Sequence, residues 1–118
     1  MNIADICQLI HKAQFRFTNE ADLQAGIAQL LTEQRVGFQR EVRVSKQDRL
    51  DFLTDGGIAI EVKIDGALAT VTRQLYRYAA EKGVHQLILV TTRMKHRQLP
   101  QTVGGKPLYI THISPFYG

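Results

Sequence analysis

The chain of 118 residues contains one cysteine, no tryptophan and three prolines. A single cysteine cannot form an internal disulfide, and with no export signal in view this predicts a reducing, cytoplasmic location. The N-terminal MNIADICQLI has no basic residues ahead of its apolar ones, so it does not resemble a secretory signal. No apolar run approaches the roughly 20 residues that span a bilayer, and we expect no membrane contact. Cys7 is expected to be a buried helix residue rather than a nucleophile, because nothing near it in the sequence would activate its thiol.

The composition is that of an ordinary globular domain. Hydrophobic residues make up 44% of the chain and charged residues 22%, and the length suits one domain with one real core. The sequence contains no internal repeat, low-complexity tract or linker, so residues 1–118 are predicted to form a single domain. A net charge of +4 is compatible with a nucleic-acid partner but does not establish one.

Hydrophobic periodicity predicts the elements. Helices are expected over residues 3–14, from Glu20 to near Gly37, and from Leu68 to Gly83. Strands are expected over 38–45, 49–54, 58–65, 86–92 and 108–113, with a basic loop over 93–106. A hairpin meander followed by a helical crossover gives an α/β fold, with a mixed central sheet flanked by helices.

The stretch RLDFLTDGGIAIEVKID, residues 49–65, contains a strong hairpin signal at Asp55-Gly56-Gly57. A three-residue loop there pairs Thr54 with Ile58 and therefore sets Asp51 directly opposite Glu61 on one face of the sheet. A two-residue turn would shift the register by one residue and put the two carboxylates on opposite faces. The sequence leaves both registers open.

Under the first register, Asp51, Glu61 and Lys63 converge. Two carboxylates at that separation repel unless a cation lies between them, and oxygen ligands suit magnesium or manganese. A lysine two residues further along the strand could hold a water or a phosphate oxygen beside that cation. An antiparallel sheet with one solvated face, on which Glu and Lys are ordinary, explains the same spacing.

These residues resemble a known motif. Asp51, followed by Glu61-Val62-Lys63 on the next strand, resembles the PD-(D/E)xK nuclease superfamily, although Leu50 stands in place of the motif's proline. The segment QLYRY, residues 74–78, is similar to the Q-x-x-x-Y motif of the RecB-type branch. Glu20 falls where many members carry an acid on the first core helix.

The resemblance covers roughly residues 18–113 and leaves 1–17 as an N-terminal helical extension. It implies a restriction-endonuclease-like fold with an αβββαβ core, which matches the predicted order of elements from residue 20 to residue 92. It also implies a magnesium-dependent deoxyribonuclease that hydrolyses phosphodiester bonds. Small stand-alone members include Holliday-junction resolvases and phage nucleases, which points to branched DNA as a substrate. A resolvase would act as a homodimer, and a larger nucleoprotein complex is the other expected assembly.

The resemblance also assigns roles. Asp51, Glu61 and the carbonyl of Val62 would bind Mg²⁺ or Mn²⁺, with Glu20 completing the metal shell. Lys63 would orient or deprotonate the attacking water, and Gln74 would hold Lys63 or a phosphate in place. The expected nucleic-acid contacts are Arg73, Arg77, Tyr78, Arg93, Lys95 and Arg97.

Two other functions fit the same residues. One is a nucleic-acid-binding or partner-binding module that kept the fold without catalysis, and the other is a nuclease that acts on RNA. Each basic residue taken singly is also explained as solvated surface. The four histidines show no metal-ligand spacing and are left out of the predicted site.

Overall fold

The computed structural model describes residues 1–114, which form three α-helices, a short 3₁₀ helix and six strands. Their order is α1 (Ile3–Lys12), α2 (Glu20–Glu33), β1 (Phe38–Arg43), β2 (Arg49–Thr54), β3 (Ile58–Lys63), α3 (Leu68–Ala79), β4 (Gln86–Thr91), η1 (Met94–Gln98), β5 (Thr102–Val103) and β6 (Lys106–His112). Within these residues, no helix combines the length and apolarity needed to cross a bilayer.

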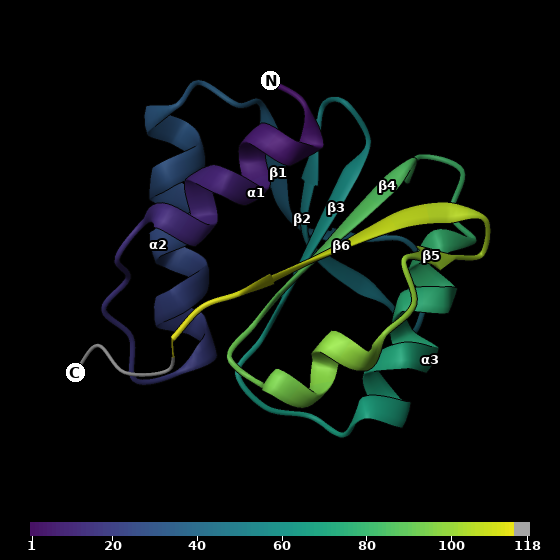
Figure 1. Ribbon diagram of the computed structural model, residues 1–118. Helices are drawn as coiled ribbons and strands as arrows, with labels where there is room; N and C mark the ends of the chain where they lie inside the picture. The colour runs from purple at the N-terminus through teal and green to yellow at the C-terminus, as the bar shows by residue number, and fades with distance from the viewer. Residues whose placement is uncertain (115–118) are drawn as a thin grey trace.

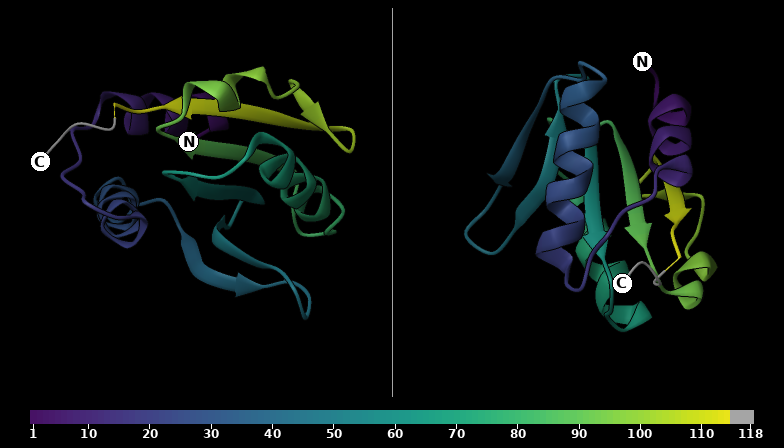
Figure 2. Two further views of the ribbon diagram at one scale, coloured as in Figure 1. Left: turned by 90° about the horizontal axis from the view of Figure 1, so that it is seen from below. Right: turned by 90° about the vertical axis from the view of Figure 1, so that its left-hand side faces the viewer.

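The strands form one mixed sheet in the order β1-β2-β3-β4-β6-β5. Strands β1 to β3 are an antiparallel meander, β3, β4 and β6 are parallel neighbours, and β5 pairs antiparallel with the start of β6. The helix α3 makes the crossover from β3 to β4, since parallel neighbours cannot be joined by a tight turn. Figure 1 shows α1 and α2 on one side of the sheet and α3 on the other, and Figure 2 shows the same layers from below and from the side. The predicted mixed α/β architecture is therefore confirmed.

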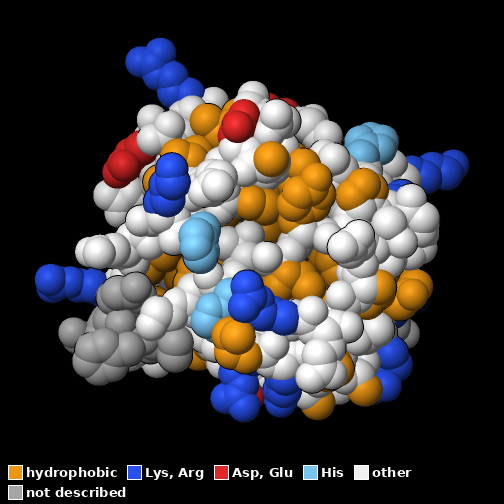
Figure 3. All heavy atoms as spheres, viewed as in Figure 1, with side chains coloured by type: hydrophobic (Ala, Val, Ile, Leu, Met, Phe, Trp, Pro, Cys, Tyr) orange, Lys and Arg blue, Asp and Glu red, His pale blue; other side chains and the backbone are white. Residues whose placement is uncertain are grey.

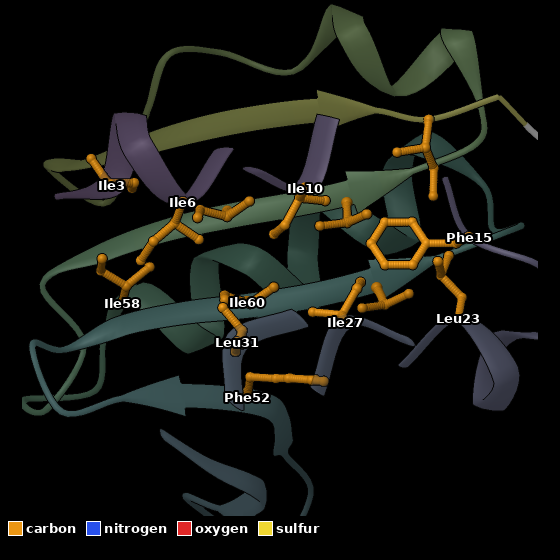
Figure 4. Close-up of a cluster of buried hydrophobic side chains, with 14 of the residues drawn as sticks. Ile3, Ile6, Ile10, Phe15, Leu23, Ile27, Leu31, Phe52, Ile58 and Ile60 are labelled. Atoms are coloured by element: carbon orange, nitrogen blue, oxygen red, sulfur yellow. The ribbon is translucent and has the colours of Figure 1, made fainter. Parts of the chain in front are cut away.

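Two hydrophobic cores lie on the two faces of this sheet. The first core packs α1 and α2 against the sheet (Figure 4), and its buried members are Ile3, Ile6, Ile10, Phe15, Phe17, Leu23, Ile27, Leu31, Phe52, Ile58, Ile60, Val62, Ile88, Val90 and Ile113. The second core lies under α3 and contains Leu50, Ala59, Val71, Leu75, Tyr78, Ala79, Val84, Leu87, Leu89, Leu99, Val103 and Leu108. Because successive residues of a strand point to opposite faces, β3 and β4 contribute to both cores. This explains the nearly continuous apolar sequence of β4.

The helix starts follow the sequence signals more closely than the helix ends. Asn19 caps α2, which begins at Glu20 as predicted, and the Asn19 side chain accepts a hydrogen bond from the Asp22 amide. The helix α2 ends at Glu33 rather than near Gly37, because the chain leaves it through Arg35 in a left-handed conformation (φ 59°). Gly37 instead lies against Asp55, where a Cβ atom would collide with the carboxylate. The other helix ends also come early, at Lys12 and Ala79.

The strand β1 lies at the sheet edge. Phe38 packs against the first core, whereas Val42 and Val44 pack against the second. Glu41, with a φ of 51°, lies between them and breaks the regular alternation. The expected loop over 93–106 contains η1 and β5.

Candidate metal and phosphate site

The turn between β2 and β3 sets the register of the two strands that carry the acids. Gly57 has a φ of 84°, and the turn is closed by hydrogen bonds from the Gly57 amide to the Thr54 carbonyl and from the Ile58 amide to the Thr54 hydroxyl, both 3.0 Å. Phe52 pairs with Ile60 and Leu53 with Ala59. Counting outward pairs Thr54 with Ile58 and sets Asp51 opposite Glu61, so the three-residue-loop register is confirmed.

Beyond Phe52 the two strands part. The Val62 amide donates to Asp51 Oδ2 at 2.8 Å, so a side chain of β2 takes the hydrogen bond that a backbone carbonyl would otherwise accept. Leu50 and Phe52 lie two residues apart in β2 yet belong to different cores, which shows that the strand turns about Asp51. Asp51 is therefore half-buried at the point where the sheet opens.

Glu61 lies on the α3 face of β3 and is 4% exposed. Its Oε2 is 3.2 Å from Lys63 Nζ, and the Tyr78 hydroxyl lies 3.5 Å away at the outer limit of a hydrogen bond. Its Oε1 is buried and has no hydrogen-bond partner within residues 1–114. A buried, unpartnered carboxylate oxygen is costly and calls for a ligand, a proton or an ion.

The pKa values of the two acids are also shifted by their burial. Burial, with repulsion from Asp51, raises the pKa of Glu61 to about 8, while Lys63 opposes the rise. Burial also raises the pKa of Asp51, against hydrogen bonds from the Val62 backbone and from Glu61. The two acids together therefore bind a proton more readily than ordinary carboxyl groups do. Burial and the neighbouring acids likewise raise the pKa of the Tyr78 phenol well above its usual range, so its hydroxyl acts as a donor.

Glu20, the first residue of α2, lies near this site without joining it. Burial raises the pKa of Glu20, with Lys63 lowering it and Asp51 raising it further, so all three side chains act on one another. However, no three His, Cys, Asp or Glu side chains among residues 1–114 are grouped so that they could hold a metal ion. The structure thus brings Asp51, Glu61 and Lys63 together and leaves Glu20 at the margin.

Asp51 and Glu61 are the two side chains here that could hold a divalent cation. The unpartnered Oε1 of Glu61 is an oxygen donor in need of a partner, and a cation would remove the repulsion that raises both pKa values. Magnesium commonly takes only one or two protein carboxylates and completes its shell with water and substrate phosphate. Asp51 and Glu61 would hold such an ion, and the Val62 amide fixes the Asp51 carboxylate.

The predicted residues of α3 have different outcomes. Tyr78 is 1% exposed, with its hydroxyl 3.3 Å from the Arg49 carbonyl, so the nucleic-acid contact expected of it is wrong. Arg77 Nε donates to both carboxylate oxygens of the buried Asp48, at 3.0 and 3.1 Å, and so ties α3 to the start of β2. Gln74 is half-buried, and its amide is in none of the hydrogen bonds formed among the described residues. Arg73 is exposed, with only a 3.5 Å contact to the Thr70 hydroxyl.

The basic residues after β4 lie at the same end of the sheet as Lys63. Strands β3 and β4 are parallel, Lys63 pairs with Thr91, and Arg93, Lys95 and Arg97 follow in and before η1, all exposed. Lys and Arg side chains gather along the lower edge of Figure 3, below the end of the sheet where η1 and the start of α3 lie in Figure 1.

Sequence reasoning missed His96, which is fully buried within this basic turn. Its ring nitrogens contact the Thr91 hydroxyl at 2.7 Å and the Gly66 carbonyl at 2.9 Å. A histidine one turn beyond a buried strand was the only local signal, because the Gly66 partner is 30 residues away.

Three hollows of the surface lie away from the acids. One of about 320 Å³ runs between α1 and β6, another follows the segment from Ala13 to Arg16 along α2, and the third lies beside the Asp55–Gly56 turn. None of the three is lined by Asp51, Glu61 or Lys63, so the acid site lies outside these hollows.

Comparison of the chain with protein-family models, with curated proteins and with solved structures found no match in any of the three.

Proposed function

We propose that the protein is a magnesium-dependent nuclease that hydrolyses phosphodiester bonds in DNA at the site formed by Asp51, Glu61 and Lys63. The observation that carries the proposal is the buried acid pair, with its unpartnered Glu61 oxygen and with Lys63 3.2 Å from the same carboxylate. A pair of buried acids without a counter-charge is destabilising, and a bound cation would supply that counter-charge. The hairpin followed by a helical crossover to a parallel strand supports a restriction-endonuclease-like version of the mixed α/β fold.

The chain's own groups have separable tasks in this proposal. Asp51 and Glu61 supply the anionic oxygens, and the Val62 amide fixes the Asp51 carboxylate. The side chain of Lys63 is 21% exposed. It can therefore reach a phosphate or a water beside the acid pair and offset the charge that develops on the phosphate. When bound, the metal would supply charge neutralisation and lower the pKa of a water molecule. Tyr78 is a positioning residue, because its buried hydroxyl touches Glu61 and no solvent.

Cleavage of a substrate panel tests this proposal. Wild type and Lys63→Ala would be compared on supercoiled plasmid, linear duplex, single strand, four-way junction and RNA, each with magnesium, with manganese and with EDTA. We expect metal-dependent cleavage of DNA that falls on the order of 10²-fold or more in the variant. Lys82→Ala is a matched control, since it removes an exposed lysine that is not among the expected nucleic-acid contacts. Faster cleavage of RNA would redirect the proposal to a ribonuclease, and cleavage that Lys63→Ala leaves unchanged would contradict it.

One observation favours a second candidate, a nucleic-acid-binding module without catalysis. No third acid, histidine or cysteine joins Asp51 and Glu61 among the described residues. Such a module would bind nucleic acid with a steep salt dependence, take up no manganese at these acids and cut nothing.

A further inference from the structure

The turn after β4 concentrates positive charge. Arg93 precedes η1, Lys95 and Arg97 lie within it, and the segment contains no acid. All three side chains are exposed. Within residues 1–114 the ion pairs are Lys63–Glu61 and Arg77–Asp48, so these three cations have no acidic partner there. The turn thus presents three uncompensated cations to solvent, and one of them, Arg97, also lines the hollow between α1 and β6.

The buried ring of His96 holds this turn in place through two hydrogen bonds. It is 0% exposed, Nε2 lies 2.9 Å from the Gly66 carbonyl, and Nδ1 lies 2.7 Å from the Thr91 hydroxyl. Because a carbonyl can only accept, Nε2 carries a proton and donates to Gly66, and Nδ1 forms the second hydrogen bond with the Thr91 hydroxyl. The same Thr91 hydroxyl accepts a hydrogen bond from the Arg93 amide at 3.0 Å. One ring therefore joins η1, the end of β4 and the loop that follows β3.

The groups that His96 joins are neighbours of Lys63. Thr91 pairs with Lys63 across the parallel strands, and both lie on the α3 face of the sheet. The Thr92 amide donates to the Lys63 carbonyl at 3.2 Å, and the Thr92 hydroxyl donates to the Ile64 carbonyl at 3.1 Å. The backbone that carries Lys63 and the backbone that carries the three cations are thus locked together.

We propose that His96 is a positioning residue that holds η1 as a second phosphate-binding point beside Lys63. A nucleic-acid strand would then be held at two places across the carboxyl ends of β3 and β4, with one phosphate at the acid site and the next ones on Arg93, Lys95 and Arg97. This inference rests on the proposed function. It adds that substrate binding depends on a buried group that contacts neither substrate nor metal.

A merely structural role for His96 makes a different prediction. If the ring only filled the protein interior, a substitution would lower stability and reduce the amount of active protein without changing how the folded protein binds. A positioning role predicts weaker substrate binding by the folded protein, with chemistry at saturating substrate largely kept. The separation of KM from kcat distinguishes the two roles.

The first experiment measures binding of labelled single-stranded and duplex DNA in EDTA over a range of salt concentrations. We expect R93A/K95A/R97A to weaken binding at least about tenfold and to lower the salt slope by about two. The triple variant K12A/K46A/K82A is the matched control, because it removes three exposed lysines from other parts of the surface. It should change both quantities much less.

The second experiment compares His96→Phe, which keeps a ring but loses both hydrogen bonds, with His96→Gln, which keeps a donor toward Gly66. For His96→Phe we expect KM for DNA cleavage to rise about tenfold and kcat to stay within about twofold, with binding in EDTA weakened to match. His96→Gln should recover most of the loss. Hydrogen exchange at the Arg93 amide should speed up in the phenylalanine variant. The Thr91 hydroxyl accepts from this amide, and in the variant it no longer has its hydrogen bond to His96.

The outcomes separate this inference from the proposed function. Suppose that wild type binds and cleaves DNA. If R93A/K95A/R97A then behaves like K12A/K46A/K82A, or if His96→Phe binds DNA like wild type, only the proposed role of η1 and His96 is contradicted. If His96→Phe does not fold, R93A/K95A/R97A and His96→Gln still decide. If wild type neither binds nor cleaves nucleic acid, both proposals fall together.

Discussion

At the scale of single residues, Glu61 carries the strongest constraint in the molecule. Its carboxyl group is buried between Asp51, Lys63 and Tyr78, and one of its oxygens has no partner among the described residues. Burial raises its pKa to about 8, from an ordinary value of 4.5. The folded protein therefore holds a proton that the unfolded chain releases over that interval, and a cation bound at the site would displace it.

This proton makes stability depend on pH in a direction opposite to that of most carboxylates. Between about pH 5 and 8 the folded state binds more protons at this site than the unfolded state, so the free energy of unfolding falls as pH rises and levels off above about 8. In EDTA, Glu61→Gln should remove most of this slope and be more stable than wild type at pH 8, by on the order of 2 kcal/mol. Urea denaturation across the pH range measures it, and a slope that the variant retains would assign the proton elsewhere.

The Tyr78 hydroxyl gives a second prediction at this scale. Tyr78→Phe keeps the packed ring but removes the donor to the Arg49 carbonyl and Glu61. We expect a loss of about 1 kcal/mol in stability, together with a higher pKa for Glu61, because the carboxylate loses a donor that favours its charged form. The inflection in the stability-pH curve should move upward, and an unchanged inflection would show that the hydroxyl serves only Arg49.

At the scale of elements, the β2–β3 hairpin and the helix α3 bring the site together. The hairpin sets Asp51 opposite Glu61, and α3 covers both and supplies Tyr78. Gly57 holds the turn at a φ of 84°, with the Gly83 carbonyl 3.1 Å from where a Cβ atom would lie. The geometry of the site therefore depends on a backbone conformation that side-chain-bearing residues rarely adopt.

Replacing each glycine of the turn in a separate variant tests whether the positive φ at Gly57 stabilises the hairpin. Gly57→Ala should lower the free energy of unfolding by about 1–2 kcal/mol, because alanine is strained at positive φ and its Cβ would meet His85. Gly56→Ala has open space around its Cβ, with the nearest atom 3.9 Å away, and should be close to neutral. Equal losses in the two variants, measured by denaturant unfolding, would argue against this account of the turn.

The Arg77–Asp48 pair gives a matched comparison along one helix. Arg77→Ala leaves the buried Asp48 carboxylate without its two donated hydrogen bonds and should lower the melting temperature. Arg73→Ala, one turn earlier and exposed, should have little effect on melting. The reverse order of melting temperatures would mean that Asp48 is satisfied in another way.

Much of this arrangement could be predicted from local sequence. The Asp55-Gly56-Gly57 turn and the alternation of β3 limited the register to two alternatives, and the structure has the one that a three-residue loop gives. Element ends were less predictable, because Arg35 adopts the left-handed conformation that glycine usually provides. Tyr78 was expected to contact nucleic acid but is buried by the way α3 docks on the sheet, and His96 is defined by partners on other segments. Contacts between distant segments leave no local pattern.

At the scale of the whole molecule, one sheet carries a hydrophobic core on each face and the charged site of Asp51, Glu61 and Lys63. Strands β3 and β4 contribute to both cores, and the carboxyl ends of both strands meet at the edge where Lys63 and η1 lie. The chain carries a net charge of +4, with three uncompensated cations in and just before η1. Lys63 and η1 lie at this one end of the sheet, where the proposed function would bring a polyanion.

The central claim is that the Asp51–Glu61 pair exchanges its proton for a divalent cation. Calorimetric titration of manganese at pH 7, repeated in buffers of different ionisation enthalpy, tests it most directly, because it reports affinity and proton release together. The account predicts one site in wild type with release of about one proton, and no such site in Glu61→Gln. No manganese binding by wild type, or equal binding by the variant, would contradict it.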